Sequence, residues 1–299
     1  MNLKKTGVRT FDVANYLTEE KVQIVIKKHA NRNEYLKVNN LWVRNFNRQH
    51  VSPKDINTFY TEEETRELIL NEVKNARLNL PNIADEALTY RKLIVVSDGF
   101  NFNQHSDVLK IMPADTCLIT VNQAQRLWAA SIFANFYLTV TTGENAASVL
   151  SERSFPKLIA SRRVHHHFLC HYKNLIYFYD PVPDVTYQSK SAKESLLLID
   201  DYRNPICACV GLANHFKVKS LYLGFCSHAF TEERPGTVKI EEGIYQYPQQ
   251  VLADKLVDAN LFWLKAANPE IQIYHTGIKK SFMFAKYLEK DLFQKALYL

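Results

Sequence analysis

Short apolar runs recur along the chain from residue 93 onward, and each run stops at a turn or at polar residues. Runs of about four to eight apolar residues bounded by turn signals are typical of buried strands. They predict six strands, at residues 93–97, 117–121, 136–140, 175–179, 220–224 and 271–274. Segments with helical spacing lie between several of these runs. This alternation predicts an α/β fold with a mostly parallel, Rossmann-like sheet and helices on both faces.

Two of the predicted helices have clear boundaries. Asn204-Pro205 opens the first one, because asparagine caps a helix and proline suits its first turn. Apolar residues then recur at helical spacing as far as Phe216. The second helix covers residues 249–267 and is broken by Asn268-Pro269 ahead of the last predicted strand.

The first 90 residues differ in composition from the rest. They are rich in charge, and residues 61–70 predict a helix with acidic side chains near its positive end. The sequence therefore divides into a mainly helical N-terminal appendage over residues 1–90 and a Rossmann-like nucleotide-binding domain over residues 91–299. The polar, proline-containing stretch 181–195 is expected to be a loop of the second part.

Composition narrows the class of protein. With 299 residues, 46% of them hydrophobic, the chain can form a large packed core. No apolar run approaches the roughly eighteen residues that cross a bilayer, and the N-terminus lacks an apolar signal segment, so we expect a cytoplasmic protein without a membrane span. The five cysteines lie mostly in apolar runs and are expected to be reduced. Cys207-Ala208-Cys209 lacks the two-residue spacer of usual zinc or redox pairs.

The formal charge of +6 favours anionic ligands. The basic residues are dispersed and form no block or tail. We therefore expect a modest phosphate-binding patch and no tight binding of nucleic acid.

Polar residues follow three of the predicted strands. Since parallel strands end at the same edge of a sheet, where α/β proteins bind nucleotides, these residues predict a nucleotide site. Its predicted binding residues are Asp98, Gly99, Asn101, Asn122 and Gln123. His228 is the predicted base, because an imidazole accepts a proton near neutral pH. The alternatives are an ordinary Asp-Gly turn and a buried structural histidine.

This succession of motifs resembles the MptE-like hydroxymethylpterin diphosphokinase family. It is also similar to the Maf flagellin glycosyltransferases and, more distantly, to bacterial sialyltransferases with a Rossmann-like fold. The resemblance covers roughly residues 90–290 and rests most on Val121-Asn122-Gln123, on Asn204-Pro205 with its helix, and on the segment 223–230, Leu-Gly-Phe-Cys-Ser-His-Ala-Phe. It implies that the first turn wraps the nucleotide and that Asn122 contacts its sugar or phosphate.

The chain departs from that pattern at three places, and at two of them the family carries an acidic residue. The family's Gly-Pro-Ser-Leu turn is Gly99-Phe100-Asn101-Phe102 here, and Thr141-Thr142 stands where MptE-like chains tend to carry Asp. The acidic residue expected between the glycine and the histidine of 224–228 is absent too. Because Mg²⁺ usually relies on carboxylates together with phosphates, these departures favour metal-independent transfer over a kinase reaction.

Two further groups are candidate phosphate contacts. Arg162 and Arg163 carry guanidinium groups that pair bidentately with phosphate oxygens. The resemblance to the sialyltransferases implies that Tyr177 and Tyr179 donate hydrogen bonds to a leaving phosphate. The alternatives are a solvated basic turn and an aromatic core strand. The pair at positions 167 and 171 has the spacing of metal-binding histidines but no nearby carboxylate, so no metal site is predicted.

These observations predict a sialyltransferase-like, metal-independent glycosyltransferase. Its donor is a nucleotide-activated sugar, with CMP compounds first, and its acceptor bears a hydroxyl group. The first alternative is an ATP-dependent pyrophosphokinase of the hydroxymethylpterin type, which requires Mg²⁺. The others are a non-catalytic nucleotide-binding module and a nucleic-acid-associated protein.

Overall fold

The computed structural model describes the chain in segments. These are residues 8–12, 23–28, 34–38, 41–44, 71, 74–86, 90–102, 113–122, 124, 134–140, 156–172, 174–181, 198–199, 201 and 204–298. The first four segments are described by their backbone alone.

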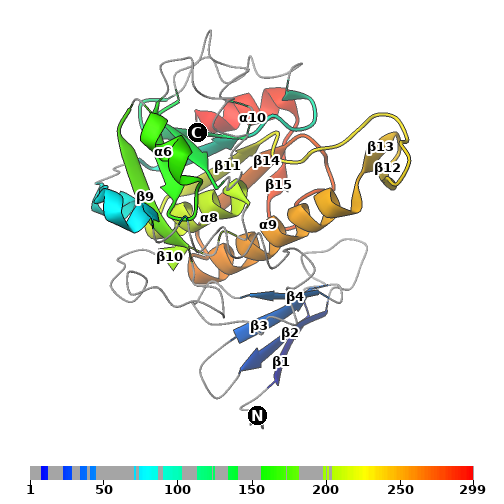
Figure 1. The fold of residues 1–299 in the computed structure, drawn as a ribbon. Coiled ribbons are helices and arrows are strands. Elements are labelled where there is room, and N and C mark those ends of the chain that lie inside the picture. Colours follow the sequence, from blue (N-terminus) through cyan, green and yellow to red (C-terminus); the bar gives the residue numbers. More distant parts are fainter. Residues whose placement is uncertain are drawn as a thin grey trace.

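A nine-stranded parallel sheet forms the centre of the molecule (Figure 1). Its strands lie in the order β10-β9-β8-β7-β6-β5-β11-β14-β15, and every neighbouring pair is parallel. The bounds are β5 Lys92–Val96, β6 Thr116–Val121, β7 Phe136–Thr139, β8 Lys157–Ser161, β9 Ile176–Pro181, β10 Leu198–Ile199, β11 Ser220–Gly224, β14 Gln272–Thr276 and β15 Lys286–Tyr287. The predicted Rossmann-like α/β fold is confirmed, and all six predicted strands belong to this sheet.

Helices cover both faces of the sheet. Helices α8 (Pro205–His215) and α9 (Pro248–Ala267) share one core cluster with Leu93 and Val95 of β5. Helix α10 (Lys290–Leu297) packs against Ile94 and Val96, the alternate residues of the same strand. Helix α6 (His166–His171) packs through a third cluster onto β8 and β9. Successive side chains of a strand point to opposite faces, so β5 is buried on both sides and reads as a continuous apolar run.

The boundary of α8 agrees with the prediction. The Asn204 side chain caps the helix by accepting a hydrogen bond from the Ile206 backbone N–H at 2.9 Å, and Pro205 occupies the first turn. The residues of α8 from 206 to 213 are all buried, because the helix lies between the sheet and α9 (Figure 1). The second predicted helix, at residues 249–267, is α9.

Several elements were not anticipated from the sequence. They include β8, β10, β15, the 3-10 turns η2 (Ala76–Leu78) and η3 (Ile83–Asp85), and a hairpin of β12 (Val238–Glu241) and β13 (Ile244–Gln246). Among the described residues of the N-terminal part, β1 (Val8–Asp12), β2 (Gln23–Lys28), β3 (Glu34–Val38) and β4 (Leu41–Arg44) form an antiparallel sheet. Consecutive β-branched residues such as Ile24, Val25 and Ile26 favour a strand here.

The mainly helical appendage over residues 1–90 stays a prediction, since its helix at 61–70 lies outside the described residues. The expected loop at 181–195 also lies outside them beyond Pro181. In the part of the chain that the structure describes, no helix combines the length and apolar character needed to span a membrane.

The direction of the connections changes between β5 and β11. From β5 the chain proceeds outward through β6, β7, β8, β9 and β10, and it then returns to add β11, β14 and β15 on the other side of β5. Open α/β sheets bind ligands outside the carboxyl ends of the strands at such a switch point. A ligand site is therefore expected at the residues that follow Val96 and Gly224.

Candidate functional site at the switch point

The loops that follow β5 and β11 are joined directly by their backbones. Gly99 N–H donates to the Phe225 carbonyl at 2.9 Å, and Phe100 N–H donates to the Ser227 carbonyl at 2.7 Å. A Cβ atom at Gly99 would stand 2.2 Å from Phe225 O and 2.3 Å from Ser227 O. Glycine is therefore required here because two loops approach each other, and its N–H has a protein partner.

These joined loops bring Asp98 and His228 together. The Asp98 Oδ1 atom lies 3.9 Å from His228 Nε2. The side chain of Asp98 is largely buried, with 16% exposed, whereas that of His228 is 39% exposed. The separation of the two groups is within the distance of an ion pair but is too long for a hydrogen bond. The exposed part of His228 remains accessible to a ligand.

Two hydrogen bonds link the Asp98 carboxylate to Ser97 and, through it, to Asn122. The Ser97 hydroxyl donates to Asp98 Oδ1 at 3.2 Å, and Asn122 Nδ2 donates to Ser97 Oγ at 2.9 Å. Asn122 adopts a left-handed conformation at the end of β6, with φ of 54°. The two hydrogen bonds connect the ends of β5 and β6, so the position of the Asp98 carboxylate depends on both strands.

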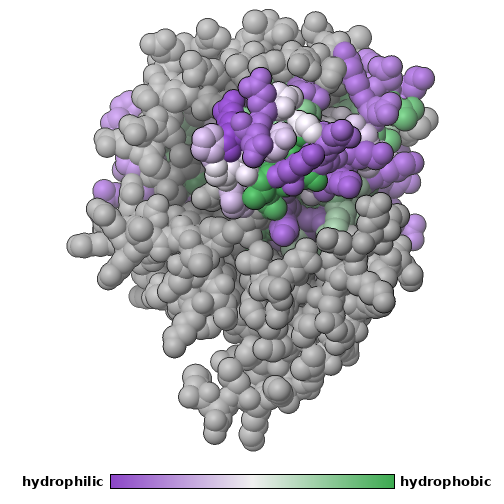
Figure 2. All heavy atoms as spheres, turned by 90° about the vertical axis from the view of Figure 1, so that its right-hand side faces the viewer, coloured by the Kyte–Doolittle hydropathy of each residue, from purple (hydrophilic) through white to green (hydrophobic). Residues whose placement is uncertain are grey.

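A cavity of about 410 Å³ opens beside this pair. It is lined by Asp98, Gly99, Phe100, Asn101, His228, Ala229, Phe230, Thr231, Arg234 and Gln250. Its volume lies within the range of small-molecule sites. Figure 2 shows the face that carries the β12–β13 hairpin, and its described part is mostly hydrophilic around a small hydrophobic group.

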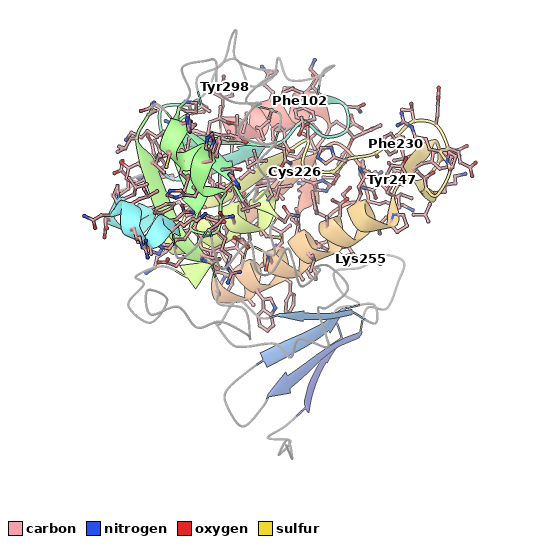
Figure 3. All side chains as sticks on the ribbon, viewed as in Figure 1. Phe102, Cys226, Phe230, Tyr247, Lys255 and Tyr298 are labelled. Carbon is pink, nitrogen blue, oxygen red and sulfur yellow. The ribbon has the colours of Figure 1, made fainter. Side chains whose placement is uncertain are left out.

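Arg234 supplies a permanent positive charge to the cavity. Its guanidinium carbon lies 3.9 Å from the centre of the Phe230 ring, a cation–π contact. Phe230 in turn packs edge-on against Tyr247, with ring centres 5.3 Å apart (Figure 3). The exposed guanidinium thus lies over an aromatic ring at the cavity, and such a group binds phosphate or carboxylate oxygens in pairs.

A buried polar group fixes the loop that carries His228. The Gln246 side chain donates through Nε2 to the His228 carbonyl and to Asp254 Oδ2, each at 2.9 Å. The backbones of Phe230 and Tyr245 exchange two further hydrogen bonds of 2.8 and 2.9 Å. Burial raises the pKa of the Asp254 carboxyl to about 7, although the hydrogen bond from Gln246 acts in the opposite direction. The loop is therefore anchored to both β13 and α9.

Two residues at the same edge of the sheet have strained backbone conformations. Asn101 and Phe225 have φ angles of 65° and 55°, in the left-handed region where residues other than glycine are uncommon. Phenylalanine is a bulky residue for this conformation, and residues held so are frequent at functional sites. The Phe225 carbonyl is the acceptor for Gly99 N–H, so this strain accompanies the joining of the loops.

Most of the predicted nucleotide-binding residues meet here. Asp98, Gly99, Asn101 and His228 all line the cavity. Asn122 lies behind Asp98 and hydrogen-bonds to Ser97, so its predicted contact with a nucleotide stays a prediction. Gln123 lies outside the described residues.

The candidate phosphate contacts lie on more distant strands and have protein partners. Arg162 Nε donates to Asp180 Oδ1 at 2.5 Å, and its guanidinium stacks on Phe178. The Tyr177 hydroxyl donates to Glu86 Oε2 at 2.8 Å, and the Tyr179 hydroxyl donates to Asp201 Oδ2 at 2.7 Å. Burial, together with the neighbouring carboxylates, raises the pKa of both tyrosines. These contacts stabilise the sheet. The three side chains lie on or next to β8 and β9, away from the switch point between β5 and β11.

Arg163 follows Arg162 in the turn after β8, and its backbone N–H faces Ser161 Oγ at 3.5 Å. The histidines of α6 interact with one another: His167 and His171 stack with ring centres 4.0 Å apart, and His171 Nδ1 lies 2.8 Å from the His167 carbonyl. In the described segments, no three His, Cys, Asp or Glu side chains form a group suited to a metal ion.

Sequence reasoning missed Ser97, Arg234, Gln246 and Asp254. Ser97 is the last residue of the predicted strand 93–97, and its polar side chain at the strand end could have identified it as a site residue. Arg234 is six residues beyond His228 in the same polar loop. Gln246 and Asp254 carried no signal, because only the packing of β13 on α9 makes them neighbours of His228.

Comparison with models of known protein families gave no match, and comparison with curated proteins gave none either.

Proposed function

We propose that the protein binds a nucleotide-activated donor at the carboxyl edge of β5 and β11 and transfers a group, a sugar in the first instance, to a hydroxyl-bearing acceptor. The observation that carries this proposal is the Asp98–His228 pair, 3.9 Å apart beside a cavity at the switch point. The resemblance of residues 90–290 to the MptE-like, Maf and sialyltransferase group supports the same class of reaction.

His228 acts as the base in this proposal. Its Nε2 atom faces Asp98, so Nδ1 is the ring nitrogen left to accept the proton of the acceptor hydroxyl. The acceptor oxygen then forms a bond to the sugar carbon of the donor. The bond from that carbon to the phosphate oxygen breaks, and the nucleotide leaves with the electron pair. Asp98 stabilises the imidazolium that results, as a carboxylate does beside other catalytic histidines.

Arg234 has the chemistry to hold the phosphate of the donor. It is the permanent cation among the described lining residues, and its guanidinium is oriented by Phe230. Charge-assisted hydrogen bonds from arginine are stronger than neutral ones, and they also offset the charge that develops on the leaving phosphate. Asn101 and Gln250 also line the cavity and provide amide groups for the remaining polar atoms of the donor.

Release of free nucleotide from a panel of donors tests this proposal. CMP-, UDP- and GDP-sugars and ATP are incubated with the full chain, with and without Mg²⁺, and free nucleotide is quantified by chromatography. His228→Ala should lower kcat by about 10²–10⁴-fold with a smaller change in KM, because general base catalysis is lost while donor contacts remain. Asp98→Asn should lower kcat less, and Arg234→Gln should raise KM.

His167→Ala is the matched control, since this exposed histidine lies on α6, away from the switch point. Turnover that is equal in wild type, His228→Ala and His167→Ala removes His228 from the mechanism. Release of AMP from ATP that requires Mg²⁺ identifies the pyrophosphokinase alternative. Nucleotide binding by calorimetry without turnover of any donor identifies the non-catalytic module.

A further inference from the structure

A second and larger cavity lies at the opposite, amino edge of the sheet. Its volume is about 830 Å³, within the range of pockets that take small organic ligands. It opens where β11 and β14 begin and where α8, α9 and α10 end. The strands separate it from the switch point, so it is independent of the function proposed above.

One side of this cavity is an aromatic wall. Tyr222 and Tyr274 are neighbours on β11 and β14, and their rings stack with centres 5.0 Å apart and planes inclined by 22°. The Tyr222 hydroxyl donates to the Ala296 carbonyl at 2.6 Å, and Phe293 packs edge-on against the Tyr222 ring. These contacts fix the plane of the pair. Tyr222 is 2% exposed, whereas Tyr274 is partly exposed and bounds the open space.

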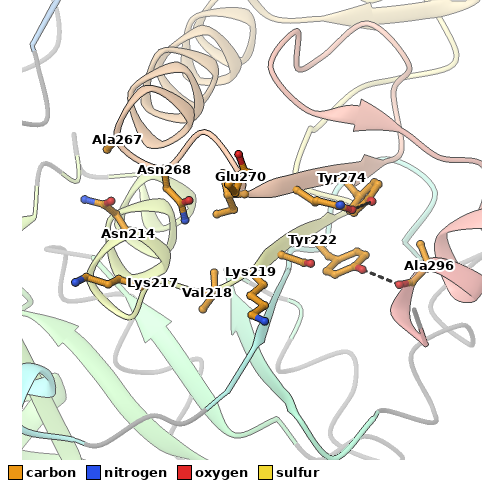
Figure 4. A pocket seen from close by; sticks show the side chains of 13 residues that line it. Asn214, Lys217, Val218, Lys219, Tyr222, Ala267, Asn268, Glu270, Tyr274 and Ala296 are labelled. Carbon is orange, nitrogen blue, oxygen red and sulfur yellow. Dashed lines mark hydrogen bonds between the residues drawn. The ribbon is translucent and has the colours of Figure 1, made fainter.

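The other side is polar and carries both signs of charge, because the carboxylate of Glu270 lines it together with two lysines. Lys217 and Lys219 are exposed, and neither forms an ion pair with the described residues. Figure 4 shows Lys219 between the tyrosine pair and Lys217, with Asn214 and Asn268 farther round the cavity. The backbone of Lys219 is fixed, because its N–H donates to the Arg91 carbonyl at 2.8 Å and its carbonyl accepts from Gln272 N–H at 3.0 Å.

Lys217 stands in an unusual conformation for a lysine. Its φ of 50° is the left-handed conformation that commonly follows a helix, where glycine or asparagine is preferred. Val218 N–H then donates to the Ala213 carbonyl and completes the end of α8. A charged residue at this position adds a second cation to the rim of the cavity.

We propose that the amino-edge cavity binds a small aromatic anion, whose ring packs beside Tyr274 and whose phosphate or carboxylate group pairs with Lys219. A planar ring and an acidic group are the two features that the tyrosine wall and the lysine accommodate together. Asn214 and Asn268 offer amide donors and acceptors to polar atoms of the ring. The competing explanation is that the lysines only neutralise the negative ends of the helices, in which case no ligand binds.

Saturation-transfer NMR with phenyl phosphate, inorganic phosphate and phenol tests the proposal on the full chain. Phenyl phosphate should bind, with the strongest transfer to its ring protons, and phenol and inorganic phosphate should compete poorly. Lys219→Gln should weaken phenyl phosphate binding by about fivefold, the upper range for one exposed ion pair. Tyr274→Leu should weaken binding and reduce the transfer to the ring.

Lys239→Gln is the matched control, because Lys239 is an exposed lysine of β12 outside the cavity and should leave the dissociation constant unchanged. Circular dichroism of each variant confirms that it is folded. Absence of phenyl phosphate binding overturns the proposal, as does inorganic phosphate competing equally well. Binding that survives Lys219→Gln but is lost in His228→Ala would place the ligand at the switch point and would also overturn it.

Discussion

Gly99→Ala should destabilise the fold by about 3 kcal/mol. The new methyl group would stand 2.2 Å from the Phe225 carbonyl oxygen and 2.3 Å from that of Ser227, and both are backbone atoms. Overpacking of this kind costs about 1–3 kcal/mol. The two loops must also separate, which weakens hydrogen bonds from Gly99 and Phe100 worth about 1 kcal/mol each. Because these loops carry Asp98 and His228, donor turnover should fall as well.

Urea unfolding, followed by circular dichroism, measures the change in the free energy of unfolding. Gly243→Ala is the reference variant: Gly243 has φ of 69°, a left-handed conformation that Gly99 does not share, and a Cβ atom there meets nothing within 4 Å. This variant isolates the backbone cost of a left-handed alanine, about 1–2 kcal/mol. A loss for Gly99→Ala below about 1 kcal/mol, or no larger than that for Gly243→Ala, would refute the close approach of the two loops.

Three further changes test the described contacts. Burial raises the pKa of Asp254 and Asp258 to about 7; their protonated forms favour the folded state, and this contribution is lost as the pH rises through 7. The free energy of unfolding should therefore drop by about 1 kcal/mol between about pH 6.5 and pH 8 for each carboxyl, and Asp258→Asn should reduce the drop. Tyr179→Phe removes a 2.7 Å hydrogen bond to buried Asp201 and should cost about 1.5–3 kcal/mol in urea unfolding. Asn204→Ala removes the cap of α8 and should lower stability by about 1 kcal/mol, whereas an unchanged midpoint would contradict the cap.

Local sequence identified six of the nine strands of the central sheet. Strands β5, β6 and β11 are mostly apolar because both of their faces are buried, and that pattern is visible in the sequence without knowledge of any neighbour. Asn204-Pro205 likewise marks the start of α8, because a cap acts within three residues of the chain. Strands β10 and β15 have two residues each, which is too short to produce a pattern.

Local sequence also identified the polar residues at the strand ends, but not the partner of each one. Asp98, Asn101 and His228 were identified because polar residues after buried strands mark a sheet edge. Gly99 was predicted to help bind a nucleotide, and this stays a prediction; the structure places it at the cavity with its N–H donating to Phe225. That partner belongs to a segment more than a hundred residues away, so no local pattern reveals it.

Strand order and long-range packing decided the rest. Placing β11 beside β5 makes the switch point and sets Asp98 next to His228, whereas Tyr177 and Tyr179 on β9 lie four strands from β5 and bind Glu86 and Asp201. The sequence alone determines the longer buried strands and the capped helix, because burial on both faces and capping leave a pattern in neighbouring residues. Only the tertiary structure decides which polar side chains meet, because that depends on the order in which hydrogen bonding and core packing join strands that are far apart in the chain.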